Sequence, residues 1–505
     1  MTLGSENKTT APAETAQENH KFASDIIWFS VAQLFISVIL GVITLPALTK
    51  SYASEIYGIW IQVSVTVDLI SPIISLQLGL AAVKFLAGEQ ESQKRRRALG
   101  AMISAIALFA IAVSAGGVIF ARQLSIFLFN SPEYVSYVSL LIGWVSFNAL
   151  FNFFISYLRA RSRIREVSII QVSLIVLKMI AILSLAYNGL SLETIIAGMI
   201  LLQAAFAVFI LVLITREVGF PVLTFFGLRQ FLAFSLPQIP AITLLWIISM
   251  SDRYFITHFL GLSENGIYSS SFMIGSLTSL IYMPISFALF PMLSKLKKEN
   301  RPDEVKSYLQ NSMKFFLTMA IPAAIGITVI SQPLLRLLTT SEFMAGEEIV
   351  FLLAFGAILL GVYNINISLI LVEKKAKLLP IVTASACVTS VTLNIILIPR
   401  TGIIGAAISN FSSYFLLATI STLWAKRATS YSLNFVHLSK VAVSASAMLL
   451  ALMYLKFDSA WGIVLDTLVG LAVFGTGLIM SRAFSSQDMR FIGKTFVSLV
   501  SREQA

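Results

Sequence analysis

The chain has 505 residues, of which 57% are hydrophobic and only 12% are charged, and its mean hydropathy is +0.86. An ordinary globular domain has roughly 25% charged residues, so this composition indicates an integral membrane protein and excludes a soluble one. The net charge of +11 would suit nucleic acid, but the basic residues lie in short loops without interleaved aromatic residues, so no nucleic-acid partner is predicted.

Fourteen apolar segments are long enough to cross a bilayer, because a spanning helix needs about 20 mostly apolar residues. They run over residues 22–48, 56–84, 99–120, 134–158, 167–187, 192–215, 230–258, 266–292, 308–333, 348–372, 379–399, 402–425, 438–456 and 461–482. A β-barrel would instead show alternating segments of about ten residues. We therefore predict an all-α, polytopic membrane protein, with tight hairpins at Asn188-Gly189 and at Arg400 to Gly402.

Both ends of the chain are predicted to be tails. Residues 1–21 are polar and rich in Ala and Thr, which is typical of a disordered cytoplasmic tail, and residues 485–505 form a second cytoplasmic tail. The first apolar run, 22–48, is too long for a signal peptide and lacks a small-residue cleavage site.

Basic residues occupy every second gap between the apolar segments. Twenty-six of the 36 Lys and Arg residues lie in the tails and in these gaps, whereas five lie in the alternate gaps. Short basic loops remain on the cytoplasmic side of a membrane. The pattern, with an even number of spans, therefore predicts a protein of the cell (inner) membrane with both termini in the cytoplasm. The basic gaps fall at residues 94–97, 159–165, 216–229, 295–306, 374–377 and 426–427.

Similar landmarks recur at a nearly constant offset along the chain. Gly58 and Gly266 follow similar Ser-Glu stretches and are 208 positions apart, while Gly189 and Gly402, in the two hairpins, are 213 apart. We infer two parallel six-helix bundles, related by an axis along the membrane normal. The predicted bundles cover residues 22–217 and 229–428, and residues 437–484 form an additional pair of transmembrane helices.

Two parallel bundles suggest a transporter in which one bundle rocks against the other around a central cavity. The three histidines are scattered and the single cysteine, Cys387, lies in an apolar run, so no metal site is predicted. The sequence has no phosphate-binding G-x-x-x-x-G-K motif, so we predict no ATPase, no cofactor and no enzymatic activity.

Several stretches along the chain form a recognisable set of motifs. They are Tyr57-Gly58-Ile59-Trp60, Leu78-Gly79-Leu80, residues 234–240 (FSLPQIP), 251–256 (SDRYFI), Gly266-Ile267-Tyr268, Pro284, residues 288–293 (ALFPML) and residues 393–407 (LNIILIPRTGIIGAA). With these motifs the chain resembles, over nearly its whole length, the polysaccharide (O-antigen or Wzx-type) flippases of the multidrug/oligosaccharidyl-lipid/polysaccharide (MOP) exporter superfamily. One departure is Gln77, where the family pattern has an acidic residue.

The resemblance implies transfer of a polyprenyl-pyrophosphate-linked oligosaccharide from the cytoplasmic to the outer leaflet. Partners implied are this lipid-linked substrate, the membrane lipids, and a polysaccharide polymerase with its chain-length regulator. A sugar and pyrophosphate headgroup cannot cross about 30 Å of hydrocarbon unassisted. A hydrated, cationic cavity that opens sideways would carry the headgroup while the tail stays in the bilayer.

Three other functions remain open. An ion-coupled drug or cation antiporter of the same superfamily would share the twelve-helix core, but the additional two helices and the quoted motifs argue against it. A membrane glycosyltransferase or polymerase would need a sizeable extramembrane region, which the short outer loops do not offer. A structural or scaffold protein would leave the charges within the membrane unexplained.

Charged residues within the apolar segments are the candidates for the substrate cavity, because each costs about 2.5–3.5 kcal/mol to insert at the bilayer centre. Lys178, Arg253 and Lys314 are the predicted cavity cations, with structural pairing or snorkelling as the alternative for each. Asp68, just before Ser71-Pro72, and Asp252 are predicted to form ion pairs, or to bind a coupling ion at Asp68.

Other polar residues in the segments receive weaker roles. Lys84 and Lys440 are explained by snorkelling, and Asp466 is predicted to lie at the membrane interface without a role. Gln62 and Asn366 are among several amides that would hydrogen-bond between helices or to sugar hydroxyls.

Overall fold

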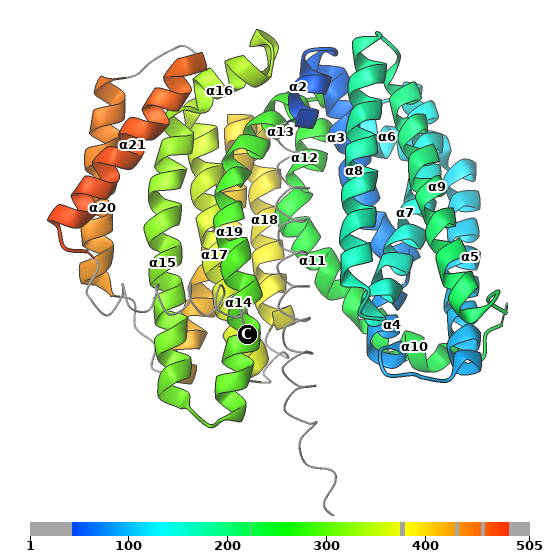
Figure 1. Cartoon of the computed structure of the whole chain (residues 1–505). Helices are drawn as coiled ribbons and strands as arrows, with labels where there is room; N and C mark the ends of the chain where they lie inside the picture. Colours follow the sequence, from blue (N-terminus) through cyan, green and yellow to red (C-terminus); the bar gives the residue numbers. More distant parts are fainter. Residues whose placement is uncertain (1–42, 223, 374–378, 430–433, 456–459, 484–505) are drawn as a thin grey trace, which may run out of the picture.

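The computed structural model describes residues 43–222, 224–373, 379–429, 434–455 and 460–483, and every regular element in these ranges is helical (Figure 1). Thirteen helical segments in the described ranges are long and apolar enough to cross a membrane, and they correspond to the second to fourteenth predicted spans. The first predicted span, 22–48, lies outside the described residues except for its last turns. The all-α membrane fold is thus confirmed, while the count of fourteen stays a prediction.

The first bundle contains the elements before residue 220. They are α2 (Thr44–Thr49), α3 (Ser54–Ile74), α4 (Leu78–Leu86), α5 (Ser92–Ile119), α6 (Ala121–Phe129), η2 (Pro132–Tyr134), α7 (Val135–Ala160), α8 (Ile164–Tyr187) and α9 (Leu192–Val218). One large hydrophobic core holds this bundle together, with Tyr157, Phe153 and Met102 among its fully buried side chains.

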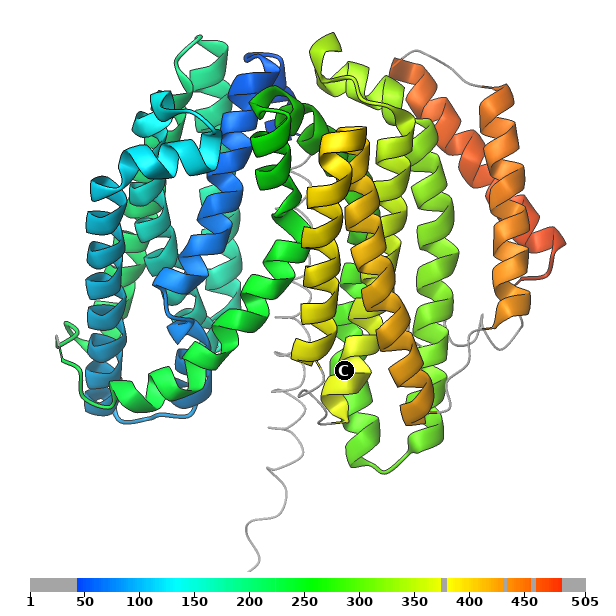
Figure 2. The same cartoon turned by 180° about the vertical axis from the view of Figure 1, so that it is seen from behind.

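The second bundle follows a connecting rod that crosses between the bundles (Figure 2). The rod consists of α10 (Leu228–Ser235), η3 (Leu236–Gln238), α11 (Ile239–Met250) and α12 (Asp252–Phe259). The second bundle comprises α13 (Leu262–Ser276), η4 (Leu277–Ile281), α14 (Tyr282–Lys298), α15 (Pro302–Val329), α16 (Ser331–Leu338), η5 (Ser341–Phe343), α17 (Glu347–Val372), α18 (Leu379–Thr401) and α19 (Ile403–Thr429).

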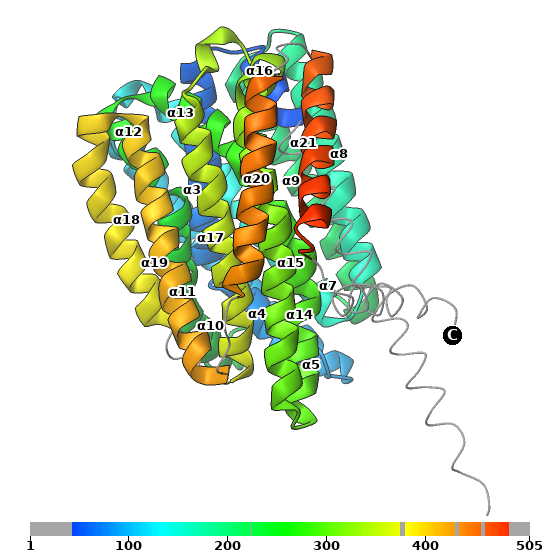
Figure 3. The same cartoon turned by 90° about the vertical axis from the view of Figure 1, so that its left-hand side faces the viewer.

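The last two helices, α20 (Phe435–Tyr454) and α21 (Ala460–Met480), pack against each other and beside α15, at the far side of the second bundle (Figures 1 and 3). Their contact has its own small hydrophobic core around Val441, Met448 and Phe474. Many outward-facing side chains, such as Ile111, Leu201 and Leu468, are large, apolar and exposed, which suits a surface covered by lipid tails.

The two ends of the bundles differ in their loops (Figure 1). Segments 87–91, 161–163 and 299–301 lie at one end, which we call the basic end because it carries the arginine and lysine clusters. The turns at 50–53 and 188–191 lie at the other end, which we call the opposite end. The predicted tight hairpins are both present, because Gly189 and Gly402 terminate α8 and α18 with φ of +70° and +68°, a conformation that glycine adopts without strain.

Three predicted spans are interrupted rather than continuous. The proline at position 72 does not end α3, which continues to Ile74 and breaks at Leu76 and Gln77, with left-handed φ of 50° and 51°. The missing N–H of Pro72 removes one helical hydrogen bond and weakens the turn before this break. The rod and the α13–α14 span each contain a short 3₁₀ segment, η3 and η4, which tightens the helix locally.

Candidate functional site

The two bundles meet at the opposite end through an unusually close helix crossing. A Cβ atom on Gly58 of α3 would lie 1.9 Å from the carbonyl oxygen of Leu262, at the start of α13. A Cβ on Gly266 of α13 would in turn lie 2.3 Å from the carbonyl oxygen of Ser54. Any larger residue at either position would collide with backbone, so the two glycines allow this contact.

Polar groups strengthen this crossing at its outer edge. Ser54 and Ser263 share a hydrogen bond of 2.5 Å between their hydroxyls, and the Ser54 amide donates to Glu342 Oε1 at 3.0 Å. Because Ser54 belongs to the first bundle and the other two residues follow the rod, these bonds link the bundles directly.

A second polar layer lies deeper in the same junction. Gln62 Oε1 on α3 accepts hydrogen bonds of 3.3 Å from both Thr257 Oγ1 and Asn265 Nδ2. Nearer the membrane centre, Thr66 and Tyr254 share a hydrogen bond of 2.6 Å. The amide of Gln62, predicted to bond either between helices or to sugar, is fully buried in this structure and serves the helix contact.

Asp68 and Lys178 lie on facing helices of the first bundle, α3 and α8. Protein atoms crowd around the Asp68 carboxylate, yet part of the side chain remains exposed. The two charges interact electrostatically, although they form no ion pair within 4.0 Å among the described residues. The structure therefore brings together two of the predicted charged residues.

Lys178 has partners on two further helices. Its ammonium group donates a hydrogen bond to Gln203 Oε1 on α9 and lies 5.7 Å from the ring centre of Trp144 on α7. An amide oxygen and an aromatic face stabilise a cation without neutralising it. The ammonium group is thus held inside the first bundle by side chains that carry no negative charge.

Arg253 and Asp252 lie where α11 gives way to α12, and both are only 3% exposed. Arg253 Nη1 donates to Asp252 Oδ1 at 2.5 Å and to the Ser249 carbonyl at 2.9 Å, while the Tyr268 hydroxyl donates to Asp252 Oδ2 at 2.6 Å. The Phe272 ring covers the guanidinium at 3.9 Å. In this conformation Arg253 is enclosed by protein and neutralised by Asp252.

Lys314 is part-buried on α15, in the second bundle. The three predicted cavity cations therefore come from α8, α12 and α15. Lys178 interacts electrostatically with another predicted site residue on a different helix, Asp68.

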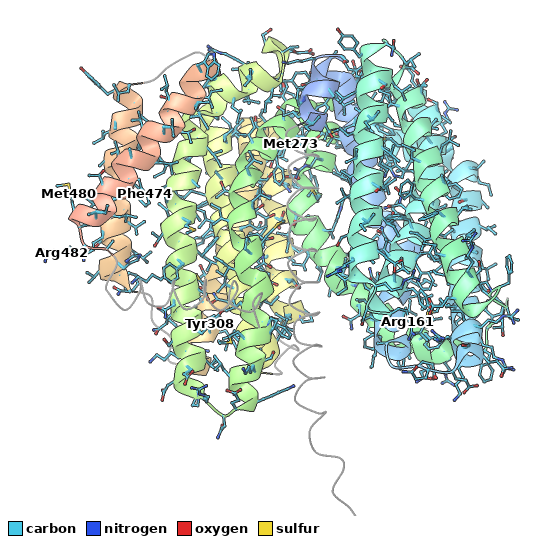
Figure 4. The ribbon with its side chains drawn as sticks, viewed as in Figure 1. Arg161, Met273, Tyr308, Phe474, Met480 and Arg482 are labelled. Carbon is cyan, nitrogen blue, oxygen red and sulfur yellow. The ribbon has the colours of Figure 1, made fainter. Side chains whose placement is uncertain are left out.

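The described residues also enclose two apolar cavities, and none of these charged residues lines either one. The larger, of about 680 Å³, lies between α3, α5–α7 and the rod, and its wall includes Leu69, Phe127, Trp246 and Tyr254. The second, of about 500 Å³, lies between α15, α20 and α21, and its wall includes Phe474, labelled in Figure 4. Such apolar walls accommodate hydrocarbon rather than a charged group.

Some residues of the site were missed by the sequence analysis. Gln203 stands alone as an amide within an apolar segment, a signal that could have paired it with Lys178. Nothing local in the sequence identifies Tyr268 as the cover of Asp252. Asp466 is 2% exposed and borders the second cavity, because α21 packs this face against α15 and α20; its predicted position at the membrane interface stays a prediction.

The described residues form an α-helical membrane protein built from two bundles, with charged side chains in its interior. Among solved structures, this fold is shared with the lipid II flippase MurJ in its inward closed conformation (TM-score 0.77, 18% identity, 90% of this chain and 99% of that one). It is also shared with an inward-facing MATE multidrug resistance transporter of the MOP superfamily (TM-score 0.65, 12% identity, 79% and 98%). At these identities the likeness shows the fold alone.

Two curated relatives come from the archaeon Haloferax volcanii. The probable low-salt glycan biosynthesis flippase Agl15 is 26% identical over 200 residues, which cover 40% of this chain and 42% of the relative. The probable flippase AglR is 26% identical over 240 residues, covering 46% and 50%. The matches therefore span half or less of these relatives, which are named as flippases rather than enzymes.

The sequence model of the polysaccharide biosynthesis protein family matches residues 89–347, just over half of the chain. This protein belongs to that family. The predicted resemblance to the polysaccharide flippases of the MOP superfamily is thereby confirmed.

Proposed function

We propose that this protein flips polyprenyl-pyrophosphate-linked oligosaccharide units from the cytoplasmic to the outer leaflet, by alternating access, for polysaccharide biosynthesis. Family membership supports this proposal, as do relatives named as glycan and lipid II flippases. The headgroup needs a polar route because each unsatisfied polar group costs several kcal/mol in hydrocarbon. The partners of the protein would be this lipid-linked substrate, the membrane lipids, a polysaccharide polymerase and a chain-length regulator.

The observation that carries the proposal is the tight closure of one end around a charged interior. Gly58 and Gly266 bring the bundles into backbone contact at the opposite end, while Asp68 remains exposed inside the protein. A conformation closed at one end is half of an alternating-access cycle. The basic end would be cytoplasmic by the positive-inside rule, so this conformation would receive substrate from the cytoplasm.

Lys178 is the residue that we assign to the pyrophosphate. Its charge is supported by Gln203 and Trp144 and is only partly balanced by Asp68, so the first bundle offers a positive potential within the membrane. Asp68 would modulate that potential or carry a coupling ion. Arg253, together with Asp252, would contribute to the electrostatic potential near the cavity and would fix the α11–α12 junction. Lys314 would attract headgroups at the basic end.

A reconstituted flipping assay tests the proposal. Purified protein in liposomes receives a fluorescent lipid-linked oligosaccharide, and an impermeant quencher reports the fraction that reaches the outer leaflet. We expect wild-type protein to accelerate this transfer, Lys178→Gln to slow it at least tenfold, and Lys84→Gln, at an exposed basic-end position, to leave it unchanged.

Two results would contradict the proposal in different ways. Absence of lipid transfer, together with ion-driven export of a small organic cation, would identify the antiporter alternative. Equal transfer by wild-type protein and by Lys178→Gln would support the flippase function but show that Lys178 does not contribute to it.

A further inference from the structure

An arginine cluster at the basic end of the first bundle is built around a single carboxylate. Arg95 Nη1 lies 3.0 Å from Glu217 Oε1, Arg163 Nη1 lies 3.3 Å from Glu217 Oε2, and Arg161 Nε lies 3.7 Å from Glu217 Oε1. These groups come from α5, the turn after α7 and the end of α9, and Arg161 marks the place in Figure 4. The Tyr157 hydroxyl interacts electrostatically with all four groups and so lies among them.

The cluster retains positive charge. Arg163 is held by a second carboxylate, Glu166, and this hydrogen bonding raises the pKa of Arg163 above its ordinary value. Two carboxylates therefore face three guanidinium groups, so the cluster keeps a net positive charge although each guanidinium has a carboxylate within 4.0 Å. The C-terminal ends of α7 and α9 favour cations here through their helix dipoles, but that effect is worth only about 0.3–1 kcal/mol at each site.

Three buried donors in the cluster have no acceptor. Arg95 Nε, Arg161 Nε and the Tyr157 hydroxyl each lack a hydrogen-bond partner among the described residues. Arg95 is 7% exposed and Tyr157 is completely buried, so water does not readily satisfy these groups. A buried polar group without a partner costs roughly 1–3 kcal/mol, and more if it is charged, so three such donors in one place point to an absent acceptor.

We propose that this arginine cluster is a binding site for the phosphate group of a lipid. A phosphate supplies several acceptor oxygens and negative charge, and guanidinium groups bind it in paired hydrogen bonds. Arg161 and Arg163 keep 21% and 27% of their side chains exposed, which leaves an approach from the surface to the buried donors. The cluster lies at the end of the transmembrane helices, at the level where lipid phosphates are found.

Either a membrane phospholipid or the polyprenyl pyrophosphate of the proposed substrate could supply this phosphate. The site does not depend on the proposed function, because it requires only the chemistry that both lipids share. Its position at the basic end of the first bundle separates it from Lys178, where transport itself is proposed to occur.

Binding to the full-length, delipidated protein in detergent tests the site by native mass spectrometry. The probes are phosphatidylglycerol, undecaprenyl pyrophosphate and, as a neutral control, diacylglycerol. We expect Arg161→Gln to weaken binding of at least one phosphate-bearing lipid fivefold or more. Tyr157→Phe, which keeps every charge, should weaken it by about threefold. The matched control is Arg97→Gln, an exposed cation on the same helix as Arg95, and it should change binding by less than twofold.

The lipid that responds identifies the source of the phosphate, and preference for either one supports the site. Equal losses for Arg161→Gln and Arg97→Gln would overturn the proposal, because they would show general surface attraction. So would unchanged binding in Tyr157→Phe, a variant chosen because removal of one hydroxyl should preserve folding. If a variant loses lipid binding but still flips its substrate, the site binds lipid without taking part in transport. If wild-type protein does not flip the substrate, that result counts against the proposed function alone.

Discussion

Replacing Gly58 by alanine should open the contact between the bundles. The new Cβ would lie 1.9 Å from the Leu262 carbonyl oxygen, so α3 and α13 must separate by about 1.5 Å to reach the 3.4 Å of an ordinary contact. Overpacking of this kind costs roughly 1–3 kcal/mol. At 1.4 kcal/mol per tenfold change, that corresponds to a shift of about 5- to 150-fold away from the conformation closed at the opposite end.

Pulsed electron spin resonance can measure this shift. Spin labels at Asn188 and Arg400, which are exposed at the opposite end of the two bundles, report their separation after the native Cys387 is replaced by Ser. We expect Gly58→Ala to move the distance distribution toward longer values and to broaden it.

Gly116→Ala is the matched control, since a Cβ at that helical position meets no atom within 4 Å. Alanine is favoured over glycine within a helix by roughly 0.5–1 kcal/mol, so both substitutions should stabilise their helices and only the collision distinguishes them. An unchanged distance distribution in a folded Gly58→Ala protein would refute the view that this crossing determines closure.

Three further substitutions test the interior. Asp252→Asn should lower the thermal stability of the purified protein substantially, because breaking a buried ion pair costs about 3–5 kcal/mol. The double variant Asp252→Asn with Arg253→Met should recover most of that stability. Equal instability of the single and the double variant would contradict this reasoning. Tyr254→Phe should remove the bond to Thr66 and, at about 0.6 kcal/mol for an average interhelical hydrogen bond in a membrane, shift the spin-label distances slightly in the direction of Gly58→Ala. Lys178→Arg should keep more flipping activity than Lys178→Gln at equal membrane abundance, and a difference in abundance alone would indicate a structural role.

The spans were predictable because hydropathy in a membrane protein depends little on tertiary partners. The segment predicted at 192–215 became α9, Leu192–Val218, and its neighbours agree as closely. The short helices α6 and α16 were missed, since eight or nine residues cannot cross a bilayer and a search for spanning segments passes over them. Broken spans were missed for a related reason: Leu76 and Gln77 have no composition that signals a left-handed backbone.

The charged residues show where sequence reasoning ends. The depth of Lys178 in its span follows from counting residues, but the face of the helix on which it lies does not, and so its contact with Gln203 required the structure. Arg253 had an obvious neighbour in Asp252. Its enclosure by Tyr268 and Phe272 depends on how α13 packs over α12, which no local pattern encodes.

The glycine crossing also tests the internal repeat. Gly58 contacts Leu262 and Gly266 contacts Ser54, and both partner pairs are related by the same offset of 208 residues. A two-fold axis between equivalent helices would produce such reciprocal contacts, because each helix would then present the same surface to the other. Gly266→Ala should consequently act like Gly58→Ala, with a somewhat smaller displacement since its Cβ would lie 2.3 Å from the opposing oxygen. If the distance between the spin labels changed in only one of the two variants, the two glycines would not contribute equally to the crossing. The common offset would then not reflect a functional two-fold symmetry.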